Sequence, residues 1–251
     1  MSGPHADAPR PLPGESARIA DLADNLGAWR IVSGVLLLVG AVVLGLFVRT
    51  RALTALDQSV LAWFISVRTP ALTAFMQAVT SVFAPRTAIL GTLVIGVVIG
   101  AATRSWRLGV YIPGTMALSS LATVVVKLGI ERIRPAMPER LVVELTASYP
   151  SGHTTAAASL AMAAAVVVLA ATGWRTVALD AGALTWRRNR RTAAVWAIAA
   201  LVTLLVGVSR LYLGAHWLSD VIGGAMVGTG VPLVCAGLIF GDEDPLEADE
   251  A

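Results

Sequence analysis

Long apolar segments dominate this sequence and limit the folds that are open to it. Hydrophobic residues make up 56% of the 251 residues and charged residues only 14%, whereas a soluble domain carries about 25% charged residues. A membrane-spanning helix needs roughly 20 mostly apolar residues. Six segments meet this need: Ile31–Val48, Thr87–Thr103, Leu108–Val126, Thr154–Thr172, Thr192–Val208 and Trp217–Phe240. We therefore expect an all-α, polytopic membrane protein with six transmembrane helices.

The stretch Leu53–Ala84 fits none of these spans. It is moderately apolar, but polar residues and a proline interrupt it at Asp57, Gln58, Arg68, Pro70 and Gln77. We expect an interfacial helix and a short second helix before the second span. If Ala71–Ala84 crossed the membrane instead, the N-terminus would move to the other side.

Polar segments at both ends frame a single membrane domain. We expect a flexible tail over residues 1–28, the six-span domain over 29–241 and an acidic tail over 242–251. Arginines cluster in two short loops, at Arg104, Arg107, Arg175, Arg187, Arg188, Arg190 and Arg191. By the positive-inside rule these loops and both termini are cytoplasmic, so the opposite loops face outward. No long polybasic tract is present, which argues against a nucleic-acid partner.

The third predicted span ends in a pair of cations. Lys127 and Arg134 are seven residues apart, which is two helical turns, so both side chains can point the same way. Pro135 disfavours helix at Arg134, and we expect the chain to break there. Taken alone, this segment is better explained by cations that merely extend to the membrane surface.

The fourth predicted span opens with Pro150-Ser151-Gly152-His153. Ser151 suits the N-cap position, and Gly152 lets a ligand approach the backbone closely. Free N–H groups and the helix dipole make such a terminus an anion site, with His153 in its first turn. The same residues would also serve as an ordinary helix start that carries an interfacial histidine.

The fifth predicted span ends in Ser209-Arg210, and His216 and Asp220 follow. His216 and Asp220 are four residues apart and are therefore neighbours on one helix face. Asp220 can accept a hydrogen bond from one ring nitrogen of His216, which leaves the other nitrogen as a nucleophile. Arg210 offers a planar set of donors for phosphate oxygens. An isolated pair of this kind would more often be structural.

The conjunction of these segments favours chemistry. The chain has three histidines and a single lysine, and all of them except His5 fall in the segments above. His153, His216, Lys127 and two arginines are thus predicted to share one face of the membrane. The set offers cations for a phosphate group, but neither the carboxylates of a magnesium site nor three zinc ligands. We therefore expect no metal and no other cofactor.

Together the three segments resemble the signature motifs of the type 2 phosphatidic acid phosphatase superfamily. The segments Lys127–Pro135, Pro150–His153 and Ser209–Asp220 match these motifs in order, in spacing and in membrane context. The motifs cover residues 127–220, the six-span layout extends the resemblance over most of the chain, and no motif position departs from the pattern. The resemblance implies a membrane-bound hydrolase that removes phosphate from a lipid.

The resemblance also implies a two-step mechanism. His216 attacks phosphorus and forms a phosphohistidine, while Asp220 stabilises the charged ring. His153 protonates the leaving oxygen and then acts as a base for water. The phosphate oxygens would be held by Lys127, Arg134, Arg210 and the backbone at Ser151 and Gly152.

The position of the site at the membrane surface, rather than any of the three motifs, predicts the class of substrate. Family members act on phosphatidic acid, phosphatidylglycerol phosphate and polyprenyl diphosphates, so the expected partners are a membrane lipid and the bilayer. The loop Ala136–Tyr149 joins two motifs over the site and is the expected selector. Two other function classes stay open. One is a non-enzymatic lipid-phosphate binder or transporter on the same scaffold, and the other is a vanadate-dependent haloperoxidase-like activity, although those enzymes are soluble.

Overall fold

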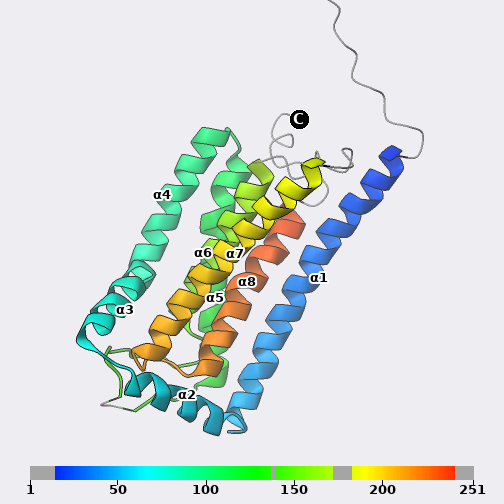
Figure 1. Cartoon of the computed structure of the whole chain (residues 1–251). Coiled ribbons are helices and arrows are strands. Elements are labelled where there is room, and N and C mark those ends of the chain that lie inside the picture. Colours follow the sequence, from blue (N-terminus) through cyan, green and yellow to red (C-terminus); the bar gives the residue numbers. More distant parts are fainter. Residues whose placement is uncertain (1–14, 137–138, 172–182, 241–251) are drawn as a thin grey trace, which may run out of the picture.

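The computed structural model describes residues 15–136, 139–171 and 183–240, with side chains placed for 27–84, 87–136, 139–171 and 190–240. Every regular element in these ranges is an α-helix, and the long helices run side by side as a bundle (Figure 1). In chain order they are α1 (Glu15–Arg49), α2 (Thr54–Ser66), α3 (Pro70–Val82), α4 (Pro85–Thr103), α5 (Trp106–Ile130), α6 (Gly152–Ala171), α7 (Ala183–Tyr212) and α8 (Leu218–Phe240). The predicted all-α architecture is confirmed.

The outer surface of the bundle is apolar. Leu36 on α1, Val97 on α4 and Leu201 on α7 are 66%, 73% and 64% exposed, and many neighbours share this exposure. Apolar surface of this extent suits hydrocarbon rather than water. Five helical segments are long and apolar enough to cross a membrane: Gly27–Arg49, Trp106–Ile130, Gly152–Ala171, Arg190–Tyr212 and Leu218–Phe240. The chain is a multi-pass membrane protein.

The second predicted span, Thr87–Thr103, corresponds to α4, which is long enough to cross only together with α3. Residues Pro70–Val82 and Thr87–Thr103 meet at an angle of 52°, and only as a pair are they long and apolar enough to cross. The bend follows Phe83, and α4 begins at Pro85, a residue that suits the first helical turn. The two helices expected between Leu53 and Ala84 are therefore both present, as α2 and α3.

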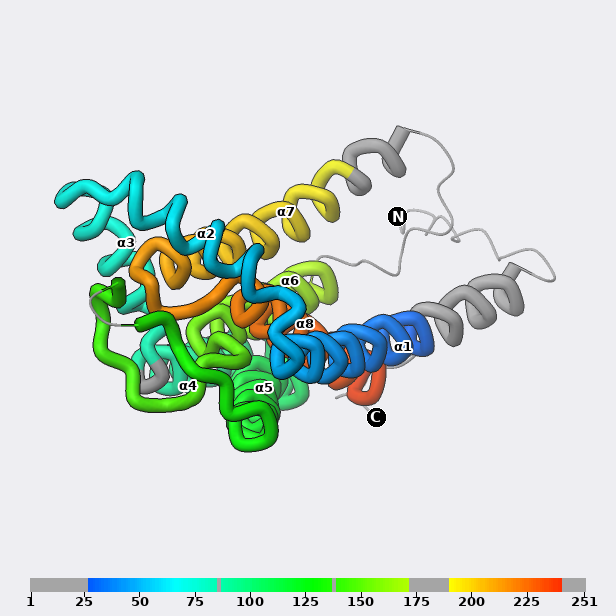
Figure 2. The backbone as a smooth tube through the Cα atoms, turned by 90° about the horizontal axis from the view of Figure 1, so that it is seen from below, coloured from blue at the N-terminus to red at the C-terminus, as the bar shows by residue number. Residues whose placement is uncertain are grey.

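Helix α2 lies across one end of the bundle instead of along it, over the ends of α7 and α8 (Figures 1 and 2). Its buried residues are Asp57 and Leu61, whereas Leu56 and Trp63 are exposed. An inward polar group and outward apolar side chains on a transverse helix fit a position at the membrane surface.

The long helices are held together by close backbone contact and by a buried core. A Cβ atom on Gly34 of α1 would lie 2.7 Å from the carbonyl oxygen of Gly230 on α8, so glycine is what allows these two helices to approach. Apolar side chains of α5, α6 and α8 form the main core cluster: Leu108, Tyr111, Ile112, Ala163, Val166, Val167, Ala236 and Phe240. This packing fixes the helix ends that carry the polar residues.

Both ends of the described chain lie at the end of the bundle opposite α2 (Figure 1). Helix α1 begins at Glu15, so residues 15–28 of the predicted flexible tail are helical. The acidic tail and Arg175 lie outside the described residues, as do the side chains of Arg187 and Arg188. The division into two tails and one domain stays a prediction.

Candidate active site

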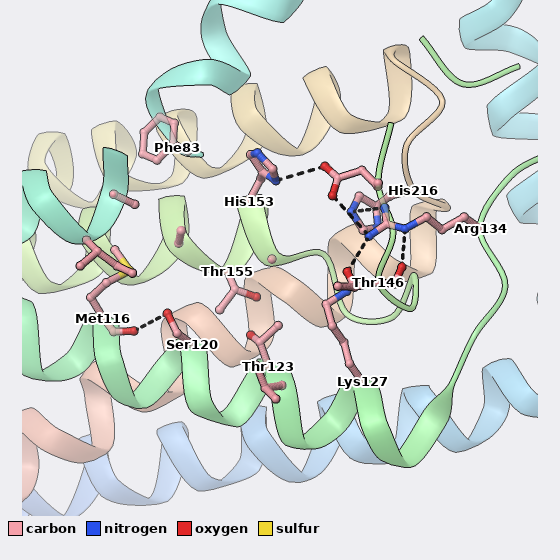
Figure 3. A pocket seen from close by; sticks show the side chains of 16 residues that line it. Phe83, Met116, Ser120, Thr123, Lys127, Arg134, Thr146, His153, Thr155 and His216 are labelled. Atoms are coloured by element: carbon pink, nitrogen blue, oxygen red, sulfur yellow. Dashed lines mark hydrogen bonds and ion pairs between the residues drawn. The ribbon is translucent and has the colours of Figure 1, made fainter. Parts of the chain in front are cut away.

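The residues selected from the three motifs come together at the end of the bundle that carries α2. They lie on four adjacent pieces of chain: the last turn of α5, the loop before α6, the first turn of α6, and the segment from the last turn of α7 to the first turn of α8. A cavity of about 260 Å³ opens between these pieces (Figure 3). Its polar wall contains Lys127, Arg134, Glu144, Thr146, Gly152, His153 and His216.

The position of the ring proton of His216 follows from its neighbours. Arg134 Nη1 lies 3.1 Å from His216 Nε2. A guanidinium group only donates, so Nε2 accepts and the proton is on Nδ1. Nδ1 faces Asp220 Oδ2 at 3.4 Å, a long contact of the kind that often tightens only when substrate binds. His216 therefore presents its unprotonated Nε2 beside the cavity.

Burial keeps the His216 ring neutral. The loss of water around the ring lowers the pKa of His216 to about 4. The Asp220 carboxylate acts to raise this pKa but does not offset the burial, and Arg134 and Arg210 lower the pKa further. At neutral pH the imidazole is uncharged, and a neutral ring with an unprotonated nitrogen is the form that can attack phosphorus.

Asp220 is held by three groups. Its Oδ2 accepts the backbone N–H of Trp217 at 2.9 Å and the hydroxyl of Ser148. Its Oδ1 accepts Arg132 Nη1 at 2.6 Å. The side chain has no exposed surface, so it cannot rotate without breaking several hydrogen bonds in a site from which water is excluded. The carboxylate is therefore fixed in an orientation that faces His216.

Arg134 and Lys127 both bind the loop that precedes α6. Arg134 Nε donates to the carbonyl oxygen of Thr146 at 2.7 Å, and its Nη1 donates to that of Ala215 at 2.8 Å. Lys127 Nζ donates to the carbonyl oxygen of Ala147. These contacts attach the loop expected to select the substrate to both cations of the first motif.

Glu144 lies in the centre of the cationic cluster. Its Oε1 is 2.5 Å from Arg210 Nη2 and 3.9 Å from His153 Nδ1, and its Oε2 is 3.8 Å from Arg134 Nη2. Burial acts to raise the pKa of Glu144, but Arg210, His153 and Arg134 outweigh it, so its pKa lies below the usual value. One carboxylate is thus bound by two of the arginines expected to hold a phosphate and lies close to His153.

At the start of α6, one residue caps the helix and the next two line the cavity. Ser151 is fully buried, and its hydroxyl accepts the backbone N–H of Thr154 at 3.5 Å, as in an N-cap. The backbone N–H of Ser151 itself donates to the carbonyl oxygen of Asp220 at 3.0 Å. The expectation that the Ser151 backbone faces the ligand is therefore not met, whereas Gly152 and His153 do line the cavity.

The far wall of the cavity is apolar. It is formed by side chains of α4, α5 and α6 and of the residues before α4: Phe83, Ala88, Ile89, Met116, Val124 and Ala156. A space with cations at one end and hydrocarbon along its length is complementary to an amphiphile with an anionic head.

Four polar residues that sequence reasoning missed contribute to the site: Asp57, Arg132, Glu144 and Ser148. Arg132 stands two residues before Arg134 within the first motif segment, and Asp57 interrupts a moderately apolar stretch, so a signal existed for these two. Glu144 and Ser148 lie in a loop without periodicity, and nothing in their spacing identifies them.

Metal-ligating side chains do not gather in the part of the chain that the structure describes. No group of three or more His, Cys, Asp and Glu residues is placed there so that it could hold an ion. The cations contact Glu144, His216 and backbone carbonyl oxygens. The donor set fits an anionic ligand.

Comparison with known proteins identifies the family. The PAP2 superfamily model matches residues 108–242. Phosphatidylglycerophosphatase B of Bacillus subtilis (strain 168) is 27% identical over 186 residues, which are 74% of this chain and 84% of that protein. The crystal structure of the transmembrane PAP2-type phosphatidylglycerolphosphate phosphatase from Bacillus subtilis superposes with a TM-score of 0.68 at 26% identity, over 82% of this chain and 95% of that one.

A second solved structure is similar in fold alone. LpxE from Aquifex aeolicus gives a TM-score of 0.51 at 20% identity, over 72% of this chain and 94% of that one. The predicted resemblance is thus confirmed by a family match that spans the three motifs and by a relative that covers most of the chain. This chain belongs to the PAP2 superfamily and is one of its membrane lipid phosphatases.

Proposed function

We propose that this lipid phosphatase works through a phosphohistidine on His216. The observation that carries the proposal is the arrangement around that ring, in which Nδ1 faces Asp220 and Nε2 is unprotonated beside the cavity. In the first step the bond from Nε2 to phosphorus forms and the bond from phosphorus to the lipid oxygen breaks. His153 gives its proton to that oxygen. In the second step His153 takes a proton from the attacking water, the bond from the water oxygen to phosphorus forms, and the bond from phosphorus to Nε2 breaks, which releases phosphate and restores His216.

The phosphate takes the place that Glu144 occupies. Arg134, Arg210 and His153 surround this carboxylate, and Lys127 lines the same cavity. Two anions cannot share one set of cations without strong repulsion, so Glu144 leaves as the substrate enters. The cations then stabilise the equatorial oxygens while charge moves from nucleophile to leaving group.

The apolar wall supports a lipid substrate. Phe83, Ile89 and Met116 line the cavity beyond its cationic end, where one hydrocarbon chain would lie. Phosphatidic acid, phosphatidylglycerol phosphate and a polyprenyl diphosphate all combine such a chain with an anionic head. The similarity to phosphatidylglycerophosphatase B makes phosphatidylglycerol phosphate the first of the three to test.

The membrane orientation is also a proposal. The cavity lies at the end of the bundle opposite the described start of α1 and end of α8 (Figure 1). Arginines in short loops favour a cytoplasmic position for both termini, which would place the cavity at the extracytoplasmic face. Labelling of single cysteines introduced near Arg104 and near Glu139 with a membrane-impermeant reagent tests this: only the second should react in intact cells.

Phosphate release by purified protein in detergent with EDTA present tests the reaction. Turnover of any of the three lipids that is lost in His216→Ala supports it, and the ranking of the lipids gives the substrate class. Activity that survives in His216→Ala refutes the proposed nucleophile, and activity that disappears with EDTA refutes a metal-free reaction. Tight binding of these lipids without phosphate release would favour a binder, and bromination in the presence of vanadate would favour the haloperoxidase-like alternative.

A further inference from the structure

Asp57 is a buried carboxylate that the proposed reaction does not use. It lies in the first turn of α2, and only 1% of its surface is exposed. Aspartate is almost never buried to this extent unless it is paired. An apolar residue here would avoid the cost of burying a charge, so the partners of Asp57 must offset that cost.

These partners belong to the start of α8. Asp57 Oδ1 accepts the backbone N–H of Ser219 at 3.0 Å, and Oδ2 accepts the Ser219 hydroxyl at 2.7 Å. Oδ2 also accepts Arg132 Nη2 at 2.6 Å. Ser219 precedes Asp220 in the first turn of α8. Asp57 therefore binds the helix terminus that carries the carboxylate facing His216.

Arg132 lies between the two carboxylates. Its Nη1 donates to Asp220 Oδ1 at 2.6 Å, while its Nη2 donates to Asp57. The guanidinium carbon is 5.5 Å from the centre of the Trp217 ring, a cation–π contact. Arg132 is absent from the cavity wall, in contrast to Arg134. It thus holds the oxygen of Asp220 that faces away from His216.

We propose that Asp57 and Arg132 are positioning residues for the phosphohistidine reaction, and the inference rests on that proposed function. Arg132 fixes Asp220 so that Oδ2 faces His216 Nδ1. Asp57 holds Arg132 in place and balances its charge, so that Arg132 does not draw Asp220 away from the ring. If Arg132 is removed, two buried carboxylates face each other with no cation between them.

Three variants test the proposal: Asp57→Asn, Arg132→Gln and the double variant. We expect kcat to fall about 10- to 100-fold in each single variant, as for other groups that orient a reacting side chain. KM should stay within about twofold, because neither residue lines the cavity. The double variant should be more active than Arg132→Gln alone, because it buries one carboxylate without a cation instead of two carboxylates that repel each other. Gln58→Ala, an exposed change on the same helix, is the matched control and should have no effect.

Vanadate and inorganic phosphate provide a readout that does not need turnover. Vanadate becomes five-coordinate when it accepts a nucleophile, so its affinity depends on the orientation of His216 as a transition-state analogue does. Measured by calorimetry, the affinity for vanadate should be about tenfold weaker in Asp57→Asn and in Arg132→Gln. The affinity for inorganic phosphate should be unchanged in both variants.

Equal loss of both anions, unaltered vanadate binding, or a double variant worse than either single variant would overturn the positioning role. A wild-type protein that hydrolyses no lipid while the vanadate result holds would refute the proposed function and leave the positioning role intact.

Discussion

Replacing Glu144 by glutamine removes one negative charge from the centre of the cationic cluster and leaves the size of the side chain almost unchanged. In the structure its carboxylate contacts Arg210 Nη2 at 2.5 Å and lies within 4 Å of Arg134 and His153. A phosphate that enters must break these contacts first. The free energy needed to displace Glu144 is therefore subtracted from the free energy of phosphate binding.

The size of the effect follows from the contact that is lost. A hydrogen bond between charged groups contributes about 1.5–3 kcal/mol, and 24% of the Glu144 side chain is exposed, so water reduces the value toward the lower limit. About 1.4 kcal/mol corresponds to a factor of ten in affinity. Glu144→Gln should therefore bind inorganic phosphate about tenfold more tightly than the wild type, and KM for the lipid should fall in parallel.

Competitive inhibition by inorganic phosphate measures this change, and calorimetry of phosphate binding repeats it without turnover. Glu131→Gln is the matched control, because Glu131 is an exposed carboxylate at the same end of the bundle that does not line the cavity. Because the pKa of Glu144 lies below its usual value, the difference should persist through the mildly acidic range. Phosphate affinity that is unchanged or weaker in Glu144→Gln would show that Glu144 supports the anion site instead of competing for it.

Three other changes test separate parts of the argument. His216→Ala should lower kcat at least about a thousandfold and abolish the phosphorylated protein that rapid mixing with substrate would trap; wild-type turnover without any such species would contradict covalent catalysis. The folded state holds the pKa of His216 at about 4 against an ordinary value of 6.5, so the unfolded chain binds more protons between these two pH values. Thermal stability in detergent should therefore fall as pH falls from about 6.5 to 4. The His216→Gln variant should lose less stability over that range. Gly214 has a φ of 67°, and a Cβ there would meet Arg68 Nη2 at 2.9 Å. Gly214→Ala should therefore lower the free energy of unfolding by about 1–3 kcal/mol. Gly91→Ala is the control and should leave the free energy of unfolding unchanged, because no atom lies within 4 Å of the added Cβ.

The helices and the paired motif residues could be predicted from sequence because both follow local rules. Hydrocarbon thickness fixes the length of a span, and the spacing of four residues places His216 and Asp220 together. We could also predict that Lys127, Arg134 and His153 lie close together, because the span ends that carry them are on the same face of the membrane. The bend between α3 and α4 was not predicted, because it depends on how the two helices pack against α5, α6 and α7.

The contacts of Asp57 and Glu144 show why the rest of the site was not predictable. Asp57 and Ser219 are 162 residues apart in the chain, and only the transverse position of α2 brings them together. Glu144 is placed by a loop whose carbonyl oxygens bind Arg134 and Lys127, so its position depends on tertiary contacts and not on periodicity. The hydrogen bond from Ser151 N–H to Asp220 is likewise a product of helix packing.

Part of the apolar wall of the cavity comes from an earlier stretch of the chain than the charged wall does. The charged wall belongs to residues 108–242, which the family model covers, whereas Phe83, Ala88 and Ile89 of the apolar wall precede that range. Mutation in the earlier stretch can therefore alter which hydrocarbon chain fits while the reacting groups stay untouched. Substitutions at Phe83, Ala88 and Ile89 therefore change the shape of the apolar wall without changing any residue of the three motifs.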